Sequence, residues 1–218
     1  MNIIKWIKKI FNTNNMKDIK PDNSTDKLYE QGAYHESGHI VIAYFYGYKC
    51  DEVRLLSNDP GAGFSRFDYS QDTVLVTSIL NSQNNSTLFN SLPKETKMES
   101  PHVAYKVSNI LLSGPVTEAF HKFGVDFVGN LEVDVNGPDL ISVKNIDYFL
   151  TEIDKQHNPD FVQHSLGNIG NVLRTDQFWK AIEHLAKTII NSPSKSLTRF
   201  EIENSLNQSG FLAYLKTL

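Results

Sequence analysis

Apolar residues recur at helical spacing over residues 26–46 of the chain. An α-helix brings positions three and four residues apart onto one side, so this spacing predicts a helix. The apolar positions around it are Leu28, Tyr34, Val41, Ile42 and Phe45. Gly47 then follows, and glycine is common just beyond the end of a helix. The pattern predicts a first long helix over about residues 26–46.

Two short segments with strand-like patterns come next. Residues 52–56 read Glu-Val-Arg-Leu-Leu and look like a short strand. Residues 63–67 alternate between apolar and polar types, which is also typical of a strand. Between them, residues 58–61 read Asn-Asp-Pro-Gly, which is typical of a turn. The two segments therefore predict a small sheet beside the first helix.

Helical patterns resume further along the chain. The predicted helices cover residues 74–80, 102–123, 138–155 and 175–191, and a final helix begins near residue 198. Pro138 stands at a first helical position, and Thr198 with Glu201 forms a capping-box pattern. Proline lacks an amide hydrogen, so Gly114-Pro115 predicts a break or kink within residues 102–123. The fold class expected is mainly α with a small β element.

Three stretches are expected to lie outside regular structure. Residues 81–87 form a polar, low-complexity loop, residues 91–101 contain two prolines and read as irregular, and residues 124–137 form a glycine-containing loop. No internal repeat is visible in the 218 residues. One domain over residues 26–218 follows from this organisation.

The start of the chain differs from the rest. Residues 3–11 combine apolar positions at roughly helical spacing with lysines on other faces, and residues 12–25 read as a polar linker. The apolar run is too short for a transmembrane helix, and its lysines argue against a signal peptide. Two interpretations stay open: contact with a membrane surface through residues 3–11, or docking on the chain's own domain or on a partner protein. We favour docking.

Composition excludes several classes of function. The formal net charge is −4, whereas a nucleic-acid-binding protein carries clustered Lys and Arg. The sequence holds no G-x-x-x-x-G-K-[ST] loop, so no nucleotide site is expected. The single cysteine, Cys50, excludes an internal disulfide and a cysteine-based zinc site. It fits a reducing compartment, and we expect a cytoplasmic protein.

The first predicted helix carries the chemistry. Residues 35–39 read His-Glu-Ser-Gly-His, an H-E-x-x-H motif. On a helix, His35 and His39 share a face and can hold one Zn²⁺, while Glu36 beside them can accept and return a proton. Gly38 is unusual here because glycine costs about 1 kcal/mol in a helix interior. Close approach of another element beside His39 would explain it.

A catalytic zinc usually has three protein ligands and one open position. A third histidine in the extended motif would require Gly at position 42 and His at 45, but Ile42 and Phe45 stand there. The third ligand must therefore come from further along the chain. The candidates are Glu118, Asp134, Asp139, His102, His121, His157 and His164.

The motif and its surroundings resemble the peptidase domain of the FtsH-type ATP-dependent zinc proteases. Residues 33–39, with the apolar residues and Gly47 that follow, look like that family's motif helix. Three looser blocks occur in the family's order, at residues 61–65, 113–120 and 136–140. Residues 181–206 resemble its closing helix pair, so the resemblance covers roughly residues 26–206.

The resemblance implies a zincin-like fold and a role for several residues. Asp139 takes the place of the family's third zinc ligand, at the start of a helix. Glu118 is expected to orient a histidine, and it is the alternative ligand. Gly63, Phe64 and Ser65 match a substrate-facing strand. The chain departs from the family because it carries no ATPase module or membrane helices, has Pro115 in place of an Arg, and has a longer gap around residues 81–100.

These observations lead to one main hypothesis and two alternatives. The main hypothesis is a free-standing zinc endopeptidase, with one Zn²⁺ per chain, that hydrolyses peptides or unfolded protein segments. The first alternative is a non-catalytic, metal-stabilised binding or regulatory module on the same fold. The second is that no metal binds. The family also assembles as rings, so a homo-oligomer is a further expectation.

Overall fold

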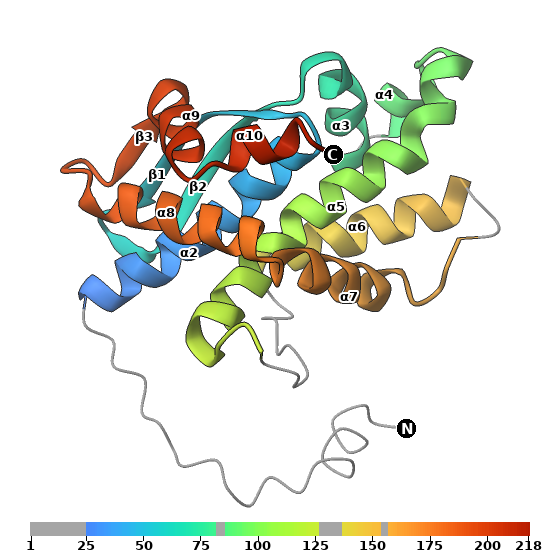
Figure 1. Ribbon diagram of the computed structural model, residues 1–218. Coiled ribbons are helices and arrows are strands. Elements are labelled where there is room, and N and C mark those ends of the chain that lie inside the picture. The colour runs from blue at the N-terminus through green and yellow to red at the C-terminus, as the bar shows by residue number, and fades with distance from the viewer. Residues whose placement is uncertain (1–24, 82–85, 127–136, 154–156) are drawn as a thin grey trace, which may run out of the picture.

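The computed structural model describes residues 25–81, 86–126, 137–153 and 157–218. The predicted amphipathic segment at residues 3–11, nearly all of the linker at 12–25, most of the loop at 124–137 and the candidate ligand Asp134 lie outside these residues. Figure 1 shows the described elements in chain order.

The described part of the chain is mostly helical, with one small antiparallel sheet in the strand order β2-β1-β3. The strands are β1 (Lys49–Leu56), β2 (Asp59–Asp68) and β3 (Ser196–Thr198). The longer helices are α2 (Thr25–Phe45), α5 (Lys94–Phe123), α6 (Pro138–Ile153), α7 (Phe161–Leu173) and α8 (Asp176–Asn191). The shorter ones are η1 (Ser70–Asp72), α3 (Thr73–Leu80), α4 (Ser86–Asn90), α9 (Arg199–Gln208) and α10 (Phe211–Leu215). The expected class, mainly α with a small β element, is confirmed.

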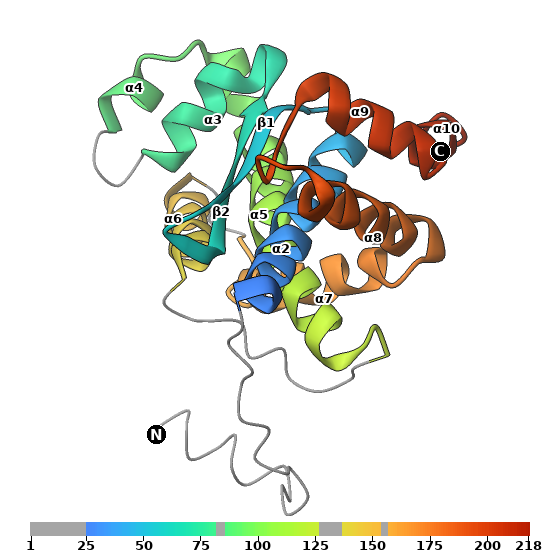
Figure 2. The same cartoon turned by 90° about the vertical axis from the view of Figure 1, so that its left-hand side faces the viewer.

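Helix α2 is the central element. It packs against α5, α8 and β2, and Figure 2 shows it between the sheet and α8. From Gly32 to Tyr44 every residue except His35 is buried. A helical segment that is covered on all sides needs apolar residues on all sides, and the run from Ile40 to Tyr44 provides them. The motif therefore sits in the most enclosed helix of the described fold, on a rigid support.

Close packing explains Gly38. A Cβ built at this position would lie 2.6 Å from the Ser113 carbonyl oxygen and would also collide with the Thr117 hydroxyl. Both residues belong to α5, so the absence of a side chain lets α2 and α5 approach each other beside His39. The packing role expected for this glycine is what the structure shows.

The sheet is a hairpin with a short third strand. β1 and β2 pair antiparallel from Lys49↔Asp68 to Leu56↔Asp59, which extends both predicted strands beyond residues 52–56 and 63–67. β3 pairs with β1 at Glu52↔Thr198, and no strand was expected there. A strand of three residues carries too little pattern to stand out in a sequence.

Helix α5 corrects two predictions. Residues 94–101, expected to be irregular, form its first turns, and the helix runs without interruption through Pro101 and Pro115. Pro101 cannot donate to the Lys97 carbonyl four residues earlier, but the Ser100 hydroxyl donates to that oxygen at 2.6 Å. Packing of α5 against α2, α6 and α7 outweighs the local cost of the prolines.

The remaining helices follow the predictions in part. α6, α8 and the capped start of α9 are confirmed, and the Thr198 N–H donates to Glu201 at 2.8 Å. Helix α7 was not expected, and α9 is not the final helix because α10 follows it.

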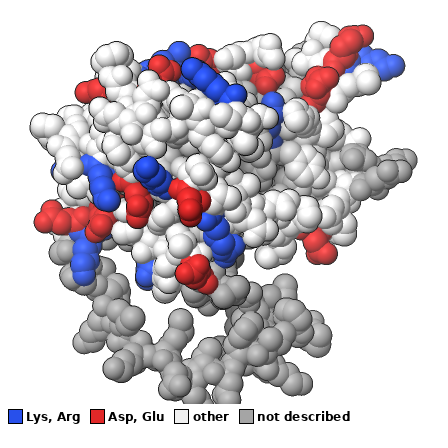
Figure 3. Space-filling view, in the orientation of Figure 1, with Lys and Arg blue, Asp and Glu red and all other residues white. Residues whose placement is uncertain are grey.

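On the face in Figure 3, Lys and Arg side chains lie among Asp and Glu side chains rather than in one large patch. No helix in the described ranges is both long and apolar enough to cross a membrane.

Candidate metal centre

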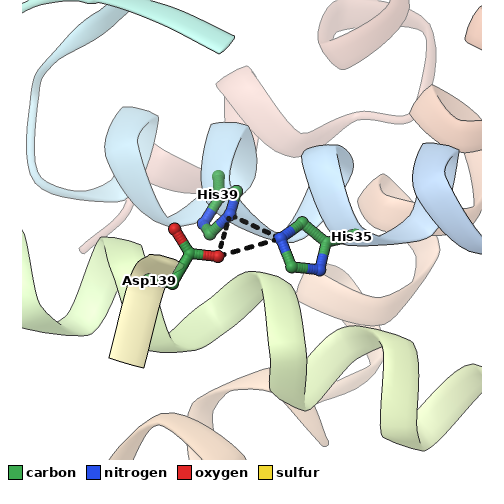
Figure 4. A group of neighbouring side chains, drawn as sticks. All are labelled: His35, His39 and Asp139. Carbon is green, nitrogen blue, oxygen red and sulfur yellow. Dashed lines mark hydrogen bonds and ion pairs between the residues drawn. The ribbon is translucent and has the colours of Figure 1, made fainter. Parts of the chain in front are cut away.

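Three side chains from two helices converge on one point (Figure 4). The Nε2 atoms of His35 and His39 lie 3.0 Å apart. The Oδ2 atom of Asp139 lies 3.0 Å from His35 Nε2 and 3.3 Å from His39 Nε2. Asp139 is the second residue of α6, after Pro138. The described residues thus bring the two motif histidines and the proposed third ligand together.

The donor set fits a zinc ion. Tetrahedral zinc bonds of about 2.0–2.1 Å to N and O atoms hold those atoms roughly 3.3 Å apart. The observed separations of 3.0 to 3.3 Å are close to this value. Two imidazoles and one carboxylate are also a ligand set that catalytic zinc sites use.

Each imidazole is oriented through its second nitrogen. His39 Nδ1 lies 2.6 Å from the Ile110 carbonyl oxygen, which can only accept, so this nitrogen donates. His35 Nδ1 lies 3.2 Å from Glu118 Oε2, and Gln31 donates to the other oxygen of Glu118. With Nδ1 of each ring donating to these acceptors, Nε2 is the nitrogen that each ring would offer to a metal ion. Glu118 therefore orients His35, as expected, and is not part of the converging group.

The charges in the site are arranged for a cation. Burial lowers the pKa of His35, but hydrogen bonds to Asp139 and Glu118 outweigh it and raise this pKa to about 10. Burial raises the pKa of Asp139, and its bonds to both histidines pull that pKa well below the usual range. The carboxylates that raise this pKa would also stabilise a metal cation, which would replace the proton on His35 Nε2.

Glu36 lies beside the three ligands and faces β2. Its side chain is only 4% exposed. The Ser65 hydroxyl donates to Glu36 Oε2 at 2.6 Å. A Cβ added at Gly63 would lie 2.8 Å from Glu36 Oε1, so the strand backbone comes close to this carboxylate. The strand thereby holds Glu36 in one position.

These groups line a cleft of about 610 Å³. Its walls come from α2, β2, α5 and the start of α6, and Gly63, Phe64 and Ser65 belong to them. The ligand atoms and Glu36 are therefore open to a molecule that enters the cleft. A site open on one side, with three protein ligands, is the arrangement of a catalytic rather than a structural zinc.

The other candidate histidines lie apart from this group. His102 and His164 are exposed. His121 stacks on Tyr34, and His157 pairs with Asp147 at 2.6 Å. Sequence reasoning missed the Ile110 carbonyl, Gln31 and Gly114. Only Gly114 left a signal, as a glycine within a predicted helix.

We compared the sequence with protein-family models and with curated proteins, and no match was found.

Gly114→Ala should remove metal binding. The new methyl group would lie 2.8 Å from His35 Nε2 and closer still to His39 Nε2, in the space where the ligand atoms meet. We expect less than about 0.1 zinc per chain by elemental analysis, because both ligands must move. Gly167→Ala is the matched control, since a Cβ there meets nothing within 4 Å. Full zinc content in Gly114→Ala would contradict the assignment.

Proposed function

We propose that this chain is a zinc-dependent endopeptidase that hydrolyses peptides or unfolded protein segments. One observation carries the proposal: His35, His39 and Asp139 converge in an open cleft, with Glu36 beside them. A non-catalytic metal module would not need a carboxylate held next to an accessible cation.

Five residues of the chain divide the work in this proposal. His35, His39 and Asp139 would hold one Zn²⁺, and when bound this ion would supply Lewis-acid activation of a water and of the scissile carbonyl. Glu36 accepts the proton of the attacking water and delivers it to the leaving amine. Ser65 keeps the Glu36 carboxylate pointed into the cleft through its hydrogen bond.

Strand β2 is suited to hold the substrate. It lies at one end of the sheet order β2-β1-β3, so one of its edges has no partner strand among the described residues. Residues Gly63, Phe64 and Ser65 of this strand line the cleft. An extended peptide can pair with such an edge, which places its backbone along the metal site. Peptides and unfolded segments fit this mode because their backbone is unpaired and extended enough to enter the cleft, whereas most backbone groups of a folded domain are already paired.

We also propose that the fold is zincin-like and related to the FtsH-type peptidase domain. The support is the order of the parts. The motif helix is followed by a cleft-lining strand, by a helix whose Glu118 orients His35, and by a helix that starts with Asp139. This is the order that the sequence resemblance implies.

Metal analysis and a cleavage assay test the proposed function together. We expect one zinc per purified chain, cleavage of casein, loss of cleavage with a chelator, and its return with added Zn²⁺. Bound zinc without cleavage of any of a panel of unfolded proteins would favour the non-catalytic module. Absence of bound metal, with no gain on adding Zn²⁺, would show that this site holds none.

Ser65→Ala should slow catalysis without removing the metal. The variant loses the hydroxyl that donates to Glu36 Oε2. A hydrogen bond to a charged group contributes about 1.5–3 kcal/mol, so we expect kcat to fall roughly tenfold or more with little change in KM. Ser65→Thr keeps the hydroxyl and should recover most of the rate. An equal loss in both variants would show that Ser65 acts through packing.

A further inference from the structure

The two ends of the cleft can be told apart from the way α2 and α5 run along it. His39 contacts the Ile110 carbonyl, whereas His35, one turn earlier on α2, contacts Glu118, two turns later on α5. The two helices therefore run in opposite directions along the cleft. The later part of α2 faces Ile110, and its earlier part faces Glu118.

Strand β2 follows the same axis. A Cβ at Gly32 would lie 3.2 Å from the Gly61 carbonyl oxygen, and Glu36 contacts Ser65. β2 therefore runs in the same direction as α2, and Phe67 lies toward the later part of α2. The metal ligands stand between the two ends because Gly114 adjoins both histidines.

The two ends differ in chemistry. The apolar end is lined by Phe67, Tyr69, Ile110 and Leu111. The charged end is lined by Glu118, Ala119, Lys122 and Phe123. The face that α5 turns to the cleft changes from aliphatic side chains, through Gly114, to charged ones. A substrate in the cleft thus meets apolar groups on one side of the metal site and charges on the other.

Lys122 gives the charged end of the cleft its positive charge. Of the described residues that line the cleft, it alone is a lysine or arginine. The carboxylate of Glu118, one turn away, is already bound by His35 and Gln31. The Lys122 ammonium lies 5.1 Å from the centre of the Phe123 ring. Burial raises the pKa of Glu118, but the hydrogen bonds from His35 and Gln31 outweigh this and lower that pKa, and the charge of Lys122 makes a small further contribution. The ammonium is exposed and can meet a carboxylate from outside.

We propose that Lys122 selects substrates by binding a carboxylate on the C-terminal side of the scissile bond, while the apolar end binds an apolar side chain on the N-terminal side. This inference rests on the proposed peptidase function. The direction follows if the substrate pairs antiparallel with β2, as β1 does on the other edge. The carboxylate belongs either to an Asp or Glu side chain or to the C-terminus of the peptide.

The helix geometry gives the position of that carboxylate. Lys122 follows Gly114 by eight residues, which corresponds to about 12 Å along the helix axis. Helix side chains lean toward the N-terminus, so the ammonium reaches back toward the metal site. An extended peptide advances about 3.3 Å per residue. The contact therefore falls at roughly the second or third residue after the scissile bond.

A set of matched peptides tests this inference. Each peptide is unstructured, has Phe or Leu before the scissile bond, and carries Glu, Gln or Lys two or three residues after it. Each is made with a free and with an amidated C-terminus. For the wild-type protein we expect kcat/KM to be about fivefold to tenfold higher with Glu than with Lys, because exposed charge pairs are modest and the comparison adds attraction to repulsion. A preference confined to free C-termini would identify the terminal carboxylate as the group bound.

Lys122→Glu should reverse the preference, so that the Lys peptide is cleaved with a higher kcat/KM than the Glu peptide. Lys180→Glu on α8 makes the same charge change outside the cleft and should keep the wild-type preference. No carboxylate preference in the wild type, a preference for a carboxylate before the scissile bond, or an unchanged preference in Lys122→Glu would overturn the inference.

Binding to zinc-loaded Glu36→Gln separates the inference from the proposed function. Fluorescence anisotropy with the same peptides measures the preference without any cleavage. If the wild type cleaves nothing but the carboxylate peptides still bind more tightly, and Lys122→Glu reverses this, the inference holds and the peptidase function does not. If binding shows no such preference, the inference fails whatever the activity.

Discussion

Glu36→Gln should reduce kcat/KM on unfolded substrates by roughly 10²–10⁴-fold, which is the contribution expected of a general acid–base group. The glutamine amide matches the carboxylate in shape, and the Ser65 hydroxyl can still bond to it. The three ligand atoms do not involve Glu36, so zinc content should stay at one per chain. Cleavage rate and metal content are measured on the same preparation.

Glu30→Gln is the control for this variant. Glu30 lies on the same helix, does not line the cleft, and contacts His121 at 3.7 Å. Its substitution removes the same charge, so activity within about twofold of the wild type is expected. Glu36→Gln with full activity would remove Glu36 from the mechanism and leave the metal assignment standing.

Asp139→Ala should abolish stable zinc binding. Its Oδ2 atom completes the triangle with the two Nε2 atoms at 3.0 and 3.3 Å. Structural zinc sites with four ligands have binding free energies of about 10–16 kcal/mol, so one ligand accounts for roughly 3 kcal/mol, or a loss of 10²-fold or more in affinity. Competition with a chromogenic chelator measures this. Added Zn²⁺ should raise the Tm of the wild type and leave that of the variant unchanged.

Glu118→Gln tests whether Glu118 and Asp139 have different roles at the metal site. Glu118 contacts His35 at Nδ1, on the side of the ring away from the converging atoms. Loss of such an orienting partner typically costs 10–100-fold in metal affinity or activity, and glutamine retains one acceptor oxygen. We therefore expect about a tenfold loss, with zinc still bound at micromolar concentrations. A larger loss of zinc affinity in Glu118→Gln than in Asp139→Ala would show that Glu118 is the third ligand and Asp139 the orienting partner.

Much of the site could be predicted from the sequence because helix geometry fixes the positions of residues that are close along the chain. His35 and His39 are four residues apart, and any α-helix puts such a pair on one face. The helix itself was marked by its apolar spacing and by Gly47. Asp139 was pointed out by the family resemblance and by its place after Pro138 at a helix start, which the structure shows as the start of α6.

Errors arose where distant packing outweighs local preference. Pro101 and Pro115 disfavour a helix locally, yet α5 continues through both because α2, α6 and α7 cover it. Strand β3 exists because β1 offers an open edge to Ser196–Thr198. Neither effect is visible in a short window of sequence, since the stabilising partner lies far away along the chain.

The sequence by itself determined the helix that carries the H-E-x-x-H motif, the side-chain types of its two histidines and glutamate, and the overall class of the fold. These depend on contacts within a few residues. The tertiary structure decided which carboxylate joins the histidines, that Glu118 and the Ile110 carbonyl orient them, that Ser65 holds Glu36, and that the cleft is apolar at one end and charged at the other. The residues in these contacts are 29 to 104 positions apart in the sequence. Only packing of the helices and the strand brings them together.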